Sequence, residues 1–127
     1  MEKLINTNLV IHINYIKSIK ISDERCVIYA DAVDFGAIKI LFDDVWDCRY
    51  TIENGVIDRS SKMLHCEEEK SSIYEVVDSQ YIQYFMNQVS GTRPTSNLKD
   101  YIIFDDVENV FEILSINAPR MVQSEID

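Results

Sequence analysis

The sequence predicts an α+β fold: a mainly antiparallel, curved β-sheet with one main amphipathic helix, at about residues 80–90, packed on it. Three observations support this prediction. Most apolar stretches alternate with a period of two and are rich in β-branched residues, which is typical of half-buried strands. One stretch has helical spacing instead. The connections between the predicted strands are short, which favours antiparallel pairing.

The first part of the chain contains three predicted strands, at residues 9–21, 26–33 and 37–42. Residues 16–17 interrupt the alternation of the first strand, and we interpret this as a bulge or a bend. Polar, turn-like residues separate the strands, and residues 34–36 end the second one.

Residues 45–53 fit a strand better than a helical stripe, because Trp46 begins a regular alternation of apolar and polar side chains. The pair Asn54-Gly55 then favours a turn, and residues 56–57 begin a further short strand. Residues 58–72 show little periodicity and predict an exposed loop, in which three consecutive glutamates form a solvated face.

The helix follows a short predicted strand at residues 73–77. Ser79 stands where an N-cap belongs, apolar residues recur after it at spacings of three, four and seven, and Gly91 is suited to end the helix.

The last apolar stretches predict a hairpin of two strands, at residues 101–104 and 110–115. The alternative is a helix over residues 107–114, capped by an aspartate. We expect the 127 residues to form a single domain, with a polar tail that frays from about residue 120.

The charge of the chain excludes several classes of function. The net charge is −10, and residues 43–127 supply all of it, because residues 1–42 carry equal numbers of acidic and basic side chains. Such a chain is poorly suited to bind nucleic acid or anionic lipid, and no apolar run is long enough for a membrane span. We therefore expect basic protein partners, although acidity also serves solubility alone.

The cysteines and histidines predict neither a metal site nor a catalytic site. Cys26, Cys48 and Cys66 are odd in number and widely spaced, and the N-terminal residues do not read as a signal peptide, so we expect reduced thiols in the cytoplasm. No Cys-x-x-Cys pair, phosphate-binding loop or nucleophile elbow is present. The sequence predicts a protein without cofactor or metal that is not an enzyme.

Three segments carry a resemblance to a known class of protein. They are FDDVWDCRYTIENGVIDRSSKM, SQYIQYFMNQVSGTRP and LKDYIIFDDVENVFEILSINAP, within residues 42–119. The chain resembles small acidic bacterial immunity proteins, which are encoded beside polymorphic toxins and toxins of contact-dependent growth inhibition. The resemblance implies a cytoplasmic, non-catalytic protein that binds the C-terminal domain of one cognate toxin, a basic nuclease, and neutralises it as a 1:1 complex.

The candidate binding residues are acidic side chains at the ends of two apolar strands, together with one tryptophan: Asp43, Asp44, Trp46, Asp47, Asp105, Asp106 and Glu108. If these strand ends are neighbours, they form one acidic rim around an aromatic anchor. The alternative is that Trp46 belongs to the core and the acids only keep the strand ends soluble. Alternative functions are a small-molecule-binding domain, a small enzyme or a homo-oligomeric subunit that uses an exposed sheet edge.

Overall fold

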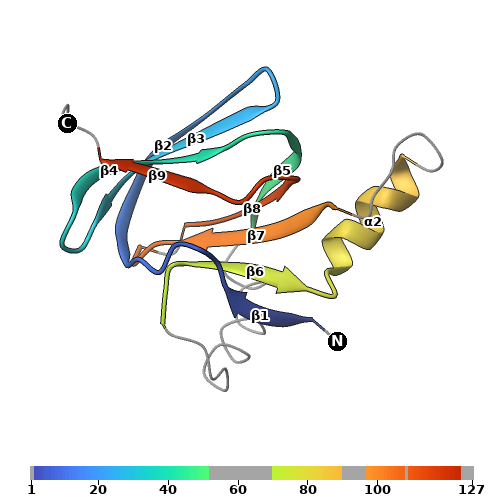
Figure 1. Cartoon of the computed structure of the whole chain (residues 1–127), viewed down its shortest axis with the longest axis horizontal. Helices are drawn as coiled ribbons and strands as arrows, with labels where there is room; N and C mark the ends of the chain where they lie inside the picture. The colour runs from blue at the N-terminus through green and yellow to red at the C-terminus, as the bar shows by residue number, and fades with distance from the viewer. Residues whose placement is uncertain (1, 52–69, 90–96, 108, 124–127) are drawn as a thin grey trace.

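The structure is a computed structural model that describes residues 2–51, 70–89, 97–107 and 109–123. Within these residues the chain forms two antiparallel sheets and a helix (Figure 1). The five-stranded sheet has the order β1 (Lys3–Asn6), β6 (Ile73–Val77), β7 (Lys99–Phe104), β8 (Val110–Ser115) and β5 (Val45–Thr51). The four-stranded sheet has the order β2 (Ile13–Ser22), β3 (Arg25–Ala32), β4 (Gly36–Phe42) and β9 (Arg120–Gln123).

The predicted antiparallel architecture is confirmed, but the strands divide into two open sheets where we expected one curved sheet. The hairpin prediction is confirmed as well, since β7 and β8 pair from Lys99–Ser115 to Phe104–Val110. The alternative helix over residues 107–114 is therefore wrong. The predicted elements at residues 52–69, including the turn at Asn54-Gly55 and the strand at 56–57, lie outside the described residues.

The main hydrophobic core lies between the two sheets. Alternate residues of β3 and β4 are buried, as their period of two predicts, and they face buried residues of the five-stranded sheet. The fully or almost fully buried members include Ile13, Cys26, Ile28, Ile38, Ile40, Phe42, Ile73, Tyr101, Ile103 and Ile113. Phe42 and Tyr101 meet across the core with ring centroids 5.5 Å apart.

The predicted irregularity in the first long strand is confirmed. The register of β2 against β3 shifts between Ile13 and Tyr15 and again between Ile16 and Ser18. Such bulges bend a strand and let it leave the sheet plane. The second shift keeps Ile16 and Ile19 directed to the core side and leaves Lys17 exposed.

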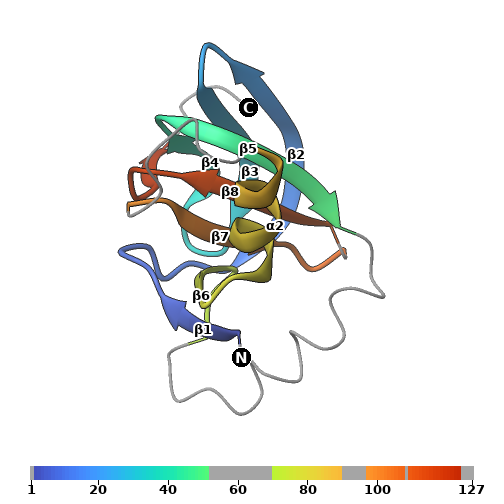
Figure 2. The same cartoon turned by 90° about the vertical axis from the view of Figure 1, so that its right-hand side faces the viewer.

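The helix α2 (Gln80–Gln88) stands at one end of the five-stranded sheet (Figures 1 and 2). The predicted N-cap is confirmed, because the Ser79 hydroxyl accepts a hydrogen bond from the Ile82 amide at 3.0 Å and also donates one to Asp100 Oδ2 at 2.6 Å. Tyr81 is the buried helix residue, and it packs with Leu98 and Leu114. The expected helix end near Gly91 lies outside the described residues.

Two strands were missed by the sequence analysis. Residues 3–6 form β1, which pairs with β6, although four residues are too few to show a period. The tail expected to fray from about residue 120 instead forms β9, whose Arg120 to Gln123 pair with Leu41 to Ile38 of β4. The backbone hydrogen bonds of this edge position outweigh the polar composition of the tail. Among the described residues, no helix is long and apolar enough to cross a membrane.

Candidate functional site

The turn between β4 and β5 carries the first group of candidate residues. Asp43 and Asp44 make the turn, and Asp44 has a φ of +55°, which aspartate tolerates better than most residues. The end of β8 anchors the turn, because Ser115 Oγ donates to the Asp43 carbonyl at 2.7 Å and the Ile116 amide donates to the Asp44 carbonyl at 3.3 Å. The backbone therefore presents both aspartates in one defined geometry.

The carboxylate of Asp43 is engaged within the protein. It receives Nε of Arg25 at 3.0 Å on one oxygen and Nη2 of Arg120 at 3.0 Å on the other. Both guanidinium groups are largely exposed, so each pair contributes little to stability. Because two cations surround this one carboxylate, the local charge is positive, and Asp43 attracts a basic partner less strongly than Asp44 does.

The turn between β2 and β3 lies beside the same corner, which the sequence analysis did not predict. The Val45 amide donates to the Glu24 carbonyl at 2.7 Å. Glu24 is exposed and has a φ of +63°. This long-range backbone contact places Glu24, a further acidic residue, beside the β4–β5 turn, and no pattern in the sequence indicates it.

Trp46 links this corner to the helix. The register of β5 against β8 shifts between Val45 and Asp47, which leaves Trp46 in a bulge. Its ring is half-buried and tilts against Phe85 of α2, with the ring centroids 6.3 Å apart. Trp46 is therefore neither a core residue nor a fully exposed one, and its position lies between the two interpretations that the sequence allows.

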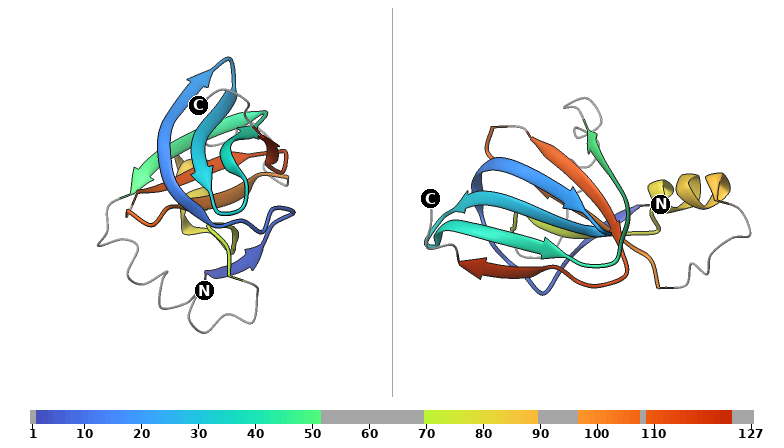
Figure 3. Two further views of the ribbon diagram at one scale, coloured as in Figure 1. Left: turned by 90° about the vertical axis from the view of Figure 1, so that its left-hand side faces the viewer. Right: turned by 90° about the horizontal axis from the view of Figure 1, so that it is seen from above.

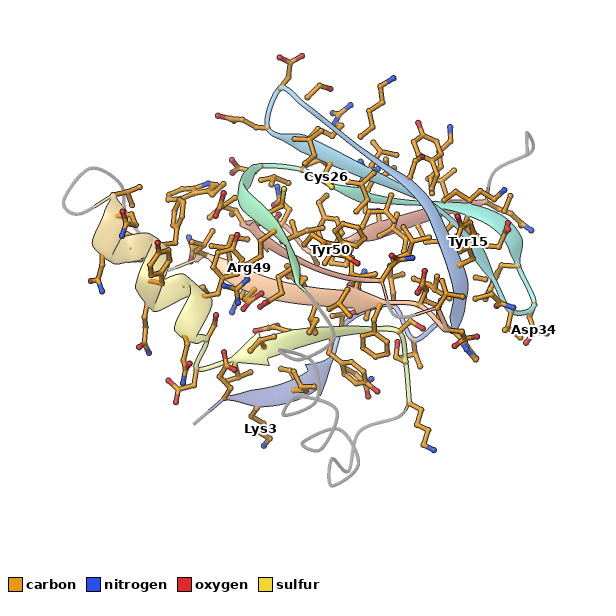
Figure 4. The ribbon with its side chains drawn as sticks, turned by 180° about the vertical axis from the view of Figure 1, so that it is seen from behind. Lys3, Tyr15, Cys26, Asp34, Arg49 and Tyr50 are labelled. Carbon is orange, nitrogen blue, oxygen red and sulfur yellow. The ribbon has the colours of Figure 1, made fainter. Side chains whose placement is uncertain are left out.

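Asp47 takes part in a polar network that joins β5, β8 and α2. The Tyr81 hydroxyl donates to Asp47 Oδ2 at 2.6 Å. The guanidinium carbon of Arg49 lies 4.0 Å from the centre of the Tyr81 ring, and its Nη2 and Nε contact Glu112 Oε1 at 2.7 Å and 3.0 Å. Figure 4 shows Arg49 between β5 and the helix. The network holds α2 against the sheet edge.

Burial, and then the hydrogen bond to Asp47, raise the pKa of the Tyr81 hydroxyl far above its usual value. Tyr81 therefore stays protonated at neutral pH and donates to the carboxylate, which fixes one oxygen of Asp47. Asp47 itself is exposed. The hydrogen bond from the Tyr81 hydroxyl thus positions the Asp47 carboxylate.

Asp105 is a structural residue of the β7–β8 turn. Its side chain is buried, and its carboxylate accepts hydrogen bonds from the Val107 and Asn109 amides at 3.0 Å and 2.9 Å and from the Asn109 side chain at 2.9 Å. It also accepts from the Ile16 amide of β2 at 2.8 Å. These four donors all belong to the protein itself, so the Asp105 carboxylate is satisfied within the fold and is not available to a binding partner.

Asp106 differs from its neighbour. It is exposed, and its two oxygens lie 2.7 Å and 2.9 Å from Nε2 of His12. Its amide donates to the Asn14 carbonyl at 3.2 Å, which fixes the turn beside β2. Glu108, the last of the candidate residues, lies outside the described residues.

The two candidate groups do not meet. Ser115 of β8 pairs with Val45, next to the first group, whereas Val110 pairs with Phe104, next to the second. The six residues of β8 thus separate them by about 17 Å of strand. The structure therefore does not bring the two groups into one acidic rim, because β5 is antiparallel to β8 and begins beside its end, whereas the β7–β8 turn precedes its start.

Sequence reasoning also missed Arg49, Tyr81 and Glu112. One signal was available: Glu112 lies within the apolar stretch of β8, and a charge at such a position requires a buried partner. Which residue supplies the partner depends on strand register, and the sequence does not specify the register.

Among the described residues, no group of three or more histidine, cysteine or acidic side chains is arranged to hold a metal ion. Comparison with family models, with curated proteins and with solved structures finds no match to this chain.

Proposed function

We propose that this chain is a binding protein of the immunity type, which neutralises a basic toxin domain, in particular a nuclease, as a 1:1 complex in the cytoplasm. The binding surface we propose, the acidic corner, consists of Asp44, Trp46 and Asp47 with Glu24 and Phe85 beside them. The observation that carries the proposal is the half-buried Trp46 ring against Phe85, with the exposed acidic residues Asp44 and Asp47 close to it along the chain.

The acidic corner has the composition of an interface core. An aromatic ring held by a helix needs little further ordering on binding, and aromatic residues are enriched where binding energy concentrates. Exposed carboxylates accelerate the approach of a basic partner and select its orientation. The net charge of −10 supplies a field of the same sign at longer range. Asp106 lies outside this surface, at the far end of β8.

The proposal is tested with the toxin domain encoded by the adjacent reading frame, in a nuclease assay with increasing amounts of this protein. Protection is expected to be stoichiometric and to weaken as salt rises, because screening limits exposed charges to about 8 Å at physiological ionic strength. Sub-stoichiometric protection, or no protection, would contradict the binding proposal and favour an enzyme.

The acidic corner itself is tested with Asp44→Asn and Asp47→Asn. Asparagine tolerates the backbone of Asp44, and at position 47 it retains an acceptor for the Tyr81 hydroxyl. Each variant is expected to slow association about threefold, with less effect on dissociation. Asp34→Asn is the matched control, because Asp34 also has a positive φ, of 72°, and Figure 4 shows it at the end of the molecule away from α2. Equal slowing by the control would place the interface elsewhere.

A further inference from the structure

The outward face of the four-stranded sheet differs in charge from the rest of the molecule. Strand register places its residues in rows across the sheet. One row contains Lys20, Val27, Leu41 and Arg120, and the next contains Ser18, Tyr29, Lys39 and Val122. Figure 3 shows the four strands side by side from above. We call these two rows, with Tyr15, Lys17, Arg25 and Asp31 at their margins, the outer sheet face.

Basic side chains outnumber acidic ones on the outer sheet face. Its basic residues are Lys17, Lys20, Arg25, Lys39 and Arg120, whereas its described carboxylates are Asp31 and, at the corner, Asp43. Both carboxylates are ion-paired: Asp31 Oδ1 lies 3.3 Å from Lys17 Nζ, and Asp43 lies between Arg25 and Arg120. The outer sheet face is therefore positively charged, although the whole chain has a net charge of −10. Solubility alone does not require basic side chains to be gathered on one face.

Two aliphatic residues, Val27 and Leu41, lie side by side in the middle of this face. Val27 and Leu41 are half-buried, and Val122 is 45% exposed. Tyr29 lies beside them with the Lys39 ammonium 5.7 Å from its ring centre, so one face of the ring is already in contact with a cation. The centre of this face, on β3 and β4, thus carries Val27, Leu41 and Tyr29 together with Lys39, and Lys20 and Arg120 flank it on the edge strands. An apolar centre with basic side chains beside it resembles a protein interface, in which apolar contacts lie inside a polar rim.

We propose that the outer sheet face binds an acidic protein surface, whose carboxylates pair with the basic rim and whose apolar side chains cover the aliphatic centre. Single-stranded nucleic acid fits less well, because bases stack on open aromatic rings and the centre offers Val27 and Leu41 instead. A second copy using the same face is disfavoured by the like charges that it would bring together. The partner has the opposite charge to the proposed toxin, so this is a different binding surface from the acidic corner, and the two surfaces adjoin where Arg25 and Arg120 pair with Asp43.

The test is a magnetic-resonance titration of the isotope-labelled full chain with a short peptide of alternating glutamate and leucine. Binding is expected to shift the amide signals of Val27, Tyr29, Leu41 and Val122 and to leave those of α2 in place. The same peptide with glutamine for glutamate is expected to bind at least about tenfold more weakly, because its charges are lost. An oligothymidine of similar length is the competing probe.

The variant Lys20→Glu/Lys39→Glu is expected to weaken binding of the acidic peptide at least about tenfold. The control, Lys3→Glu/Lys70→Glu, changes the net charge equally at two exposed positions away from this face, and it is expected to bind within about twofold of the parent. Lys20→Gln/Lys39→Gln gives an intermediate loss and serves if the reversal variant does not fold. The proposal is overturned by shifts elsewhere on the molecule, by an equal loss in the control, by tighter binding of oligothymidine, or by no binding of the peptide.

Discussion

Arg49 and Glu112 pair directly across β5 and β8, and the guanidinium covers a carboxylate that water does not reach. Their register is one-to-one, and Arg49 Nη2 lies 2.7 Å from Glu112 Oε1. The Glu112 side chain is 0% exposed, whereas that of Arg49 is 43% exposed. The same guanidinium lies over the Tyr81 ring, so this pair connects the interior of the sheet to α2.

Removal of the guanidinium is expected to destabilise the protein more than removal of the carboxylate charge. Arg49→Ala should lower the free energy of unfolding by about 2 kcal/mol, less than for a fully buried pair because Arg49 is partly hydrated. Glu112→Gln in the Arg49→Ala background should restore part of this loss, because it removes the buried charge. Urea denaturation of both variants and the double variant measures the coupling.

The control for this cycle is Lys99→Ala. Lys99 Nζ lies 3.8 Å from Glu75 Oε2 in a pair that water reaches. Its loss should cost less than about 0.5 kcal/mol. A cost for Arg49→Ala that is no larger than this would show that the cross-strand pair does not support the fold.

Asp105 is expected to be more important for stability than for binding. Asp105→Ala removes the acceptor of the Ile16, Val107 and Asn109 amides and should lower the free energy of unfolding by about 3 kcal/mol. Asp106→Ala at the neighbouring exposed position should cost less than about 0.5 kcal/mol. Thermal unfolding followed by circular dichroism checks both values. Equal costs for the two variants would contradict the structural role of Asp105.

The stability of the protein is expected to fall at alkaline pH. Burial, and then the nearby Cys48, raise the pKa of the Cys26 thiol from 9.0 to about 12, and burial, and then Glu75, raise that of the Tyr101 hydroxyl from 10.0 to about 12. Well below pH 9 both groups are protonated in the folded and the unfolded chain, so their contribution is complete. Above it the unfolded chain releases protons that the folded chain retains, and the free energy of unfolding decreases up to about pH 12.

Tyr101→Phe tests this dependence. The variant lacks the ionisable hydroxyl and should show a shallower decrease of stability between pH 10 and about 12. Tyr50→Phe is the control, because Tyr50 is 55% exposed. Urea denaturation at several pH values gives the slopes. A slope that is the same for Tyr101→Phe as for the parent chain would assign the alkaline loss to other groups.

The predictions from sequence succeeded where the signal was local. The period of two gave β3 and β4, the serine before the helix gave its N-cap, and the break at residues 16–17 gave the β2 bulge. What failed was long-range. The division into two sheets, the pairing of β9 with β4 and the separation of Asp44 from Asp106 depend on which strands pair. The hydrophobic pattern shows which face of a strand is buried but not which strand lies beside it.

Similar limits apply to the candidate residues. The aspartates share a residue type and a place after an apolar strand, yet Asp105 is an internal acceptor, Asp43 lies between two arginines, and Asp44 is exposed. These differences arise from partners that are distant in sequence, so composition alone treats them as equivalent.

The pairing of β4 with β9 also affects how the chain reaches its fold during synthesis. Strands β2, β3 and β4 follow one another closely and can associate while the chain is still growing. The neighbour of β4 on its other side is β9, which begins only at Arg120. The hydrogen-bonding edge of β4 must therefore wait for most of the remaining chain, and the core side of the first three strands is covered only when β6, β7 and β8 have followed. Non-local pairing of this kind slows folding to about milliseconds to seconds and leaves an apolar surface open to association in the meantime. The nascent chain is thus most vulnerable to aggregation in the interval between the synthesis of β4 and that of β9.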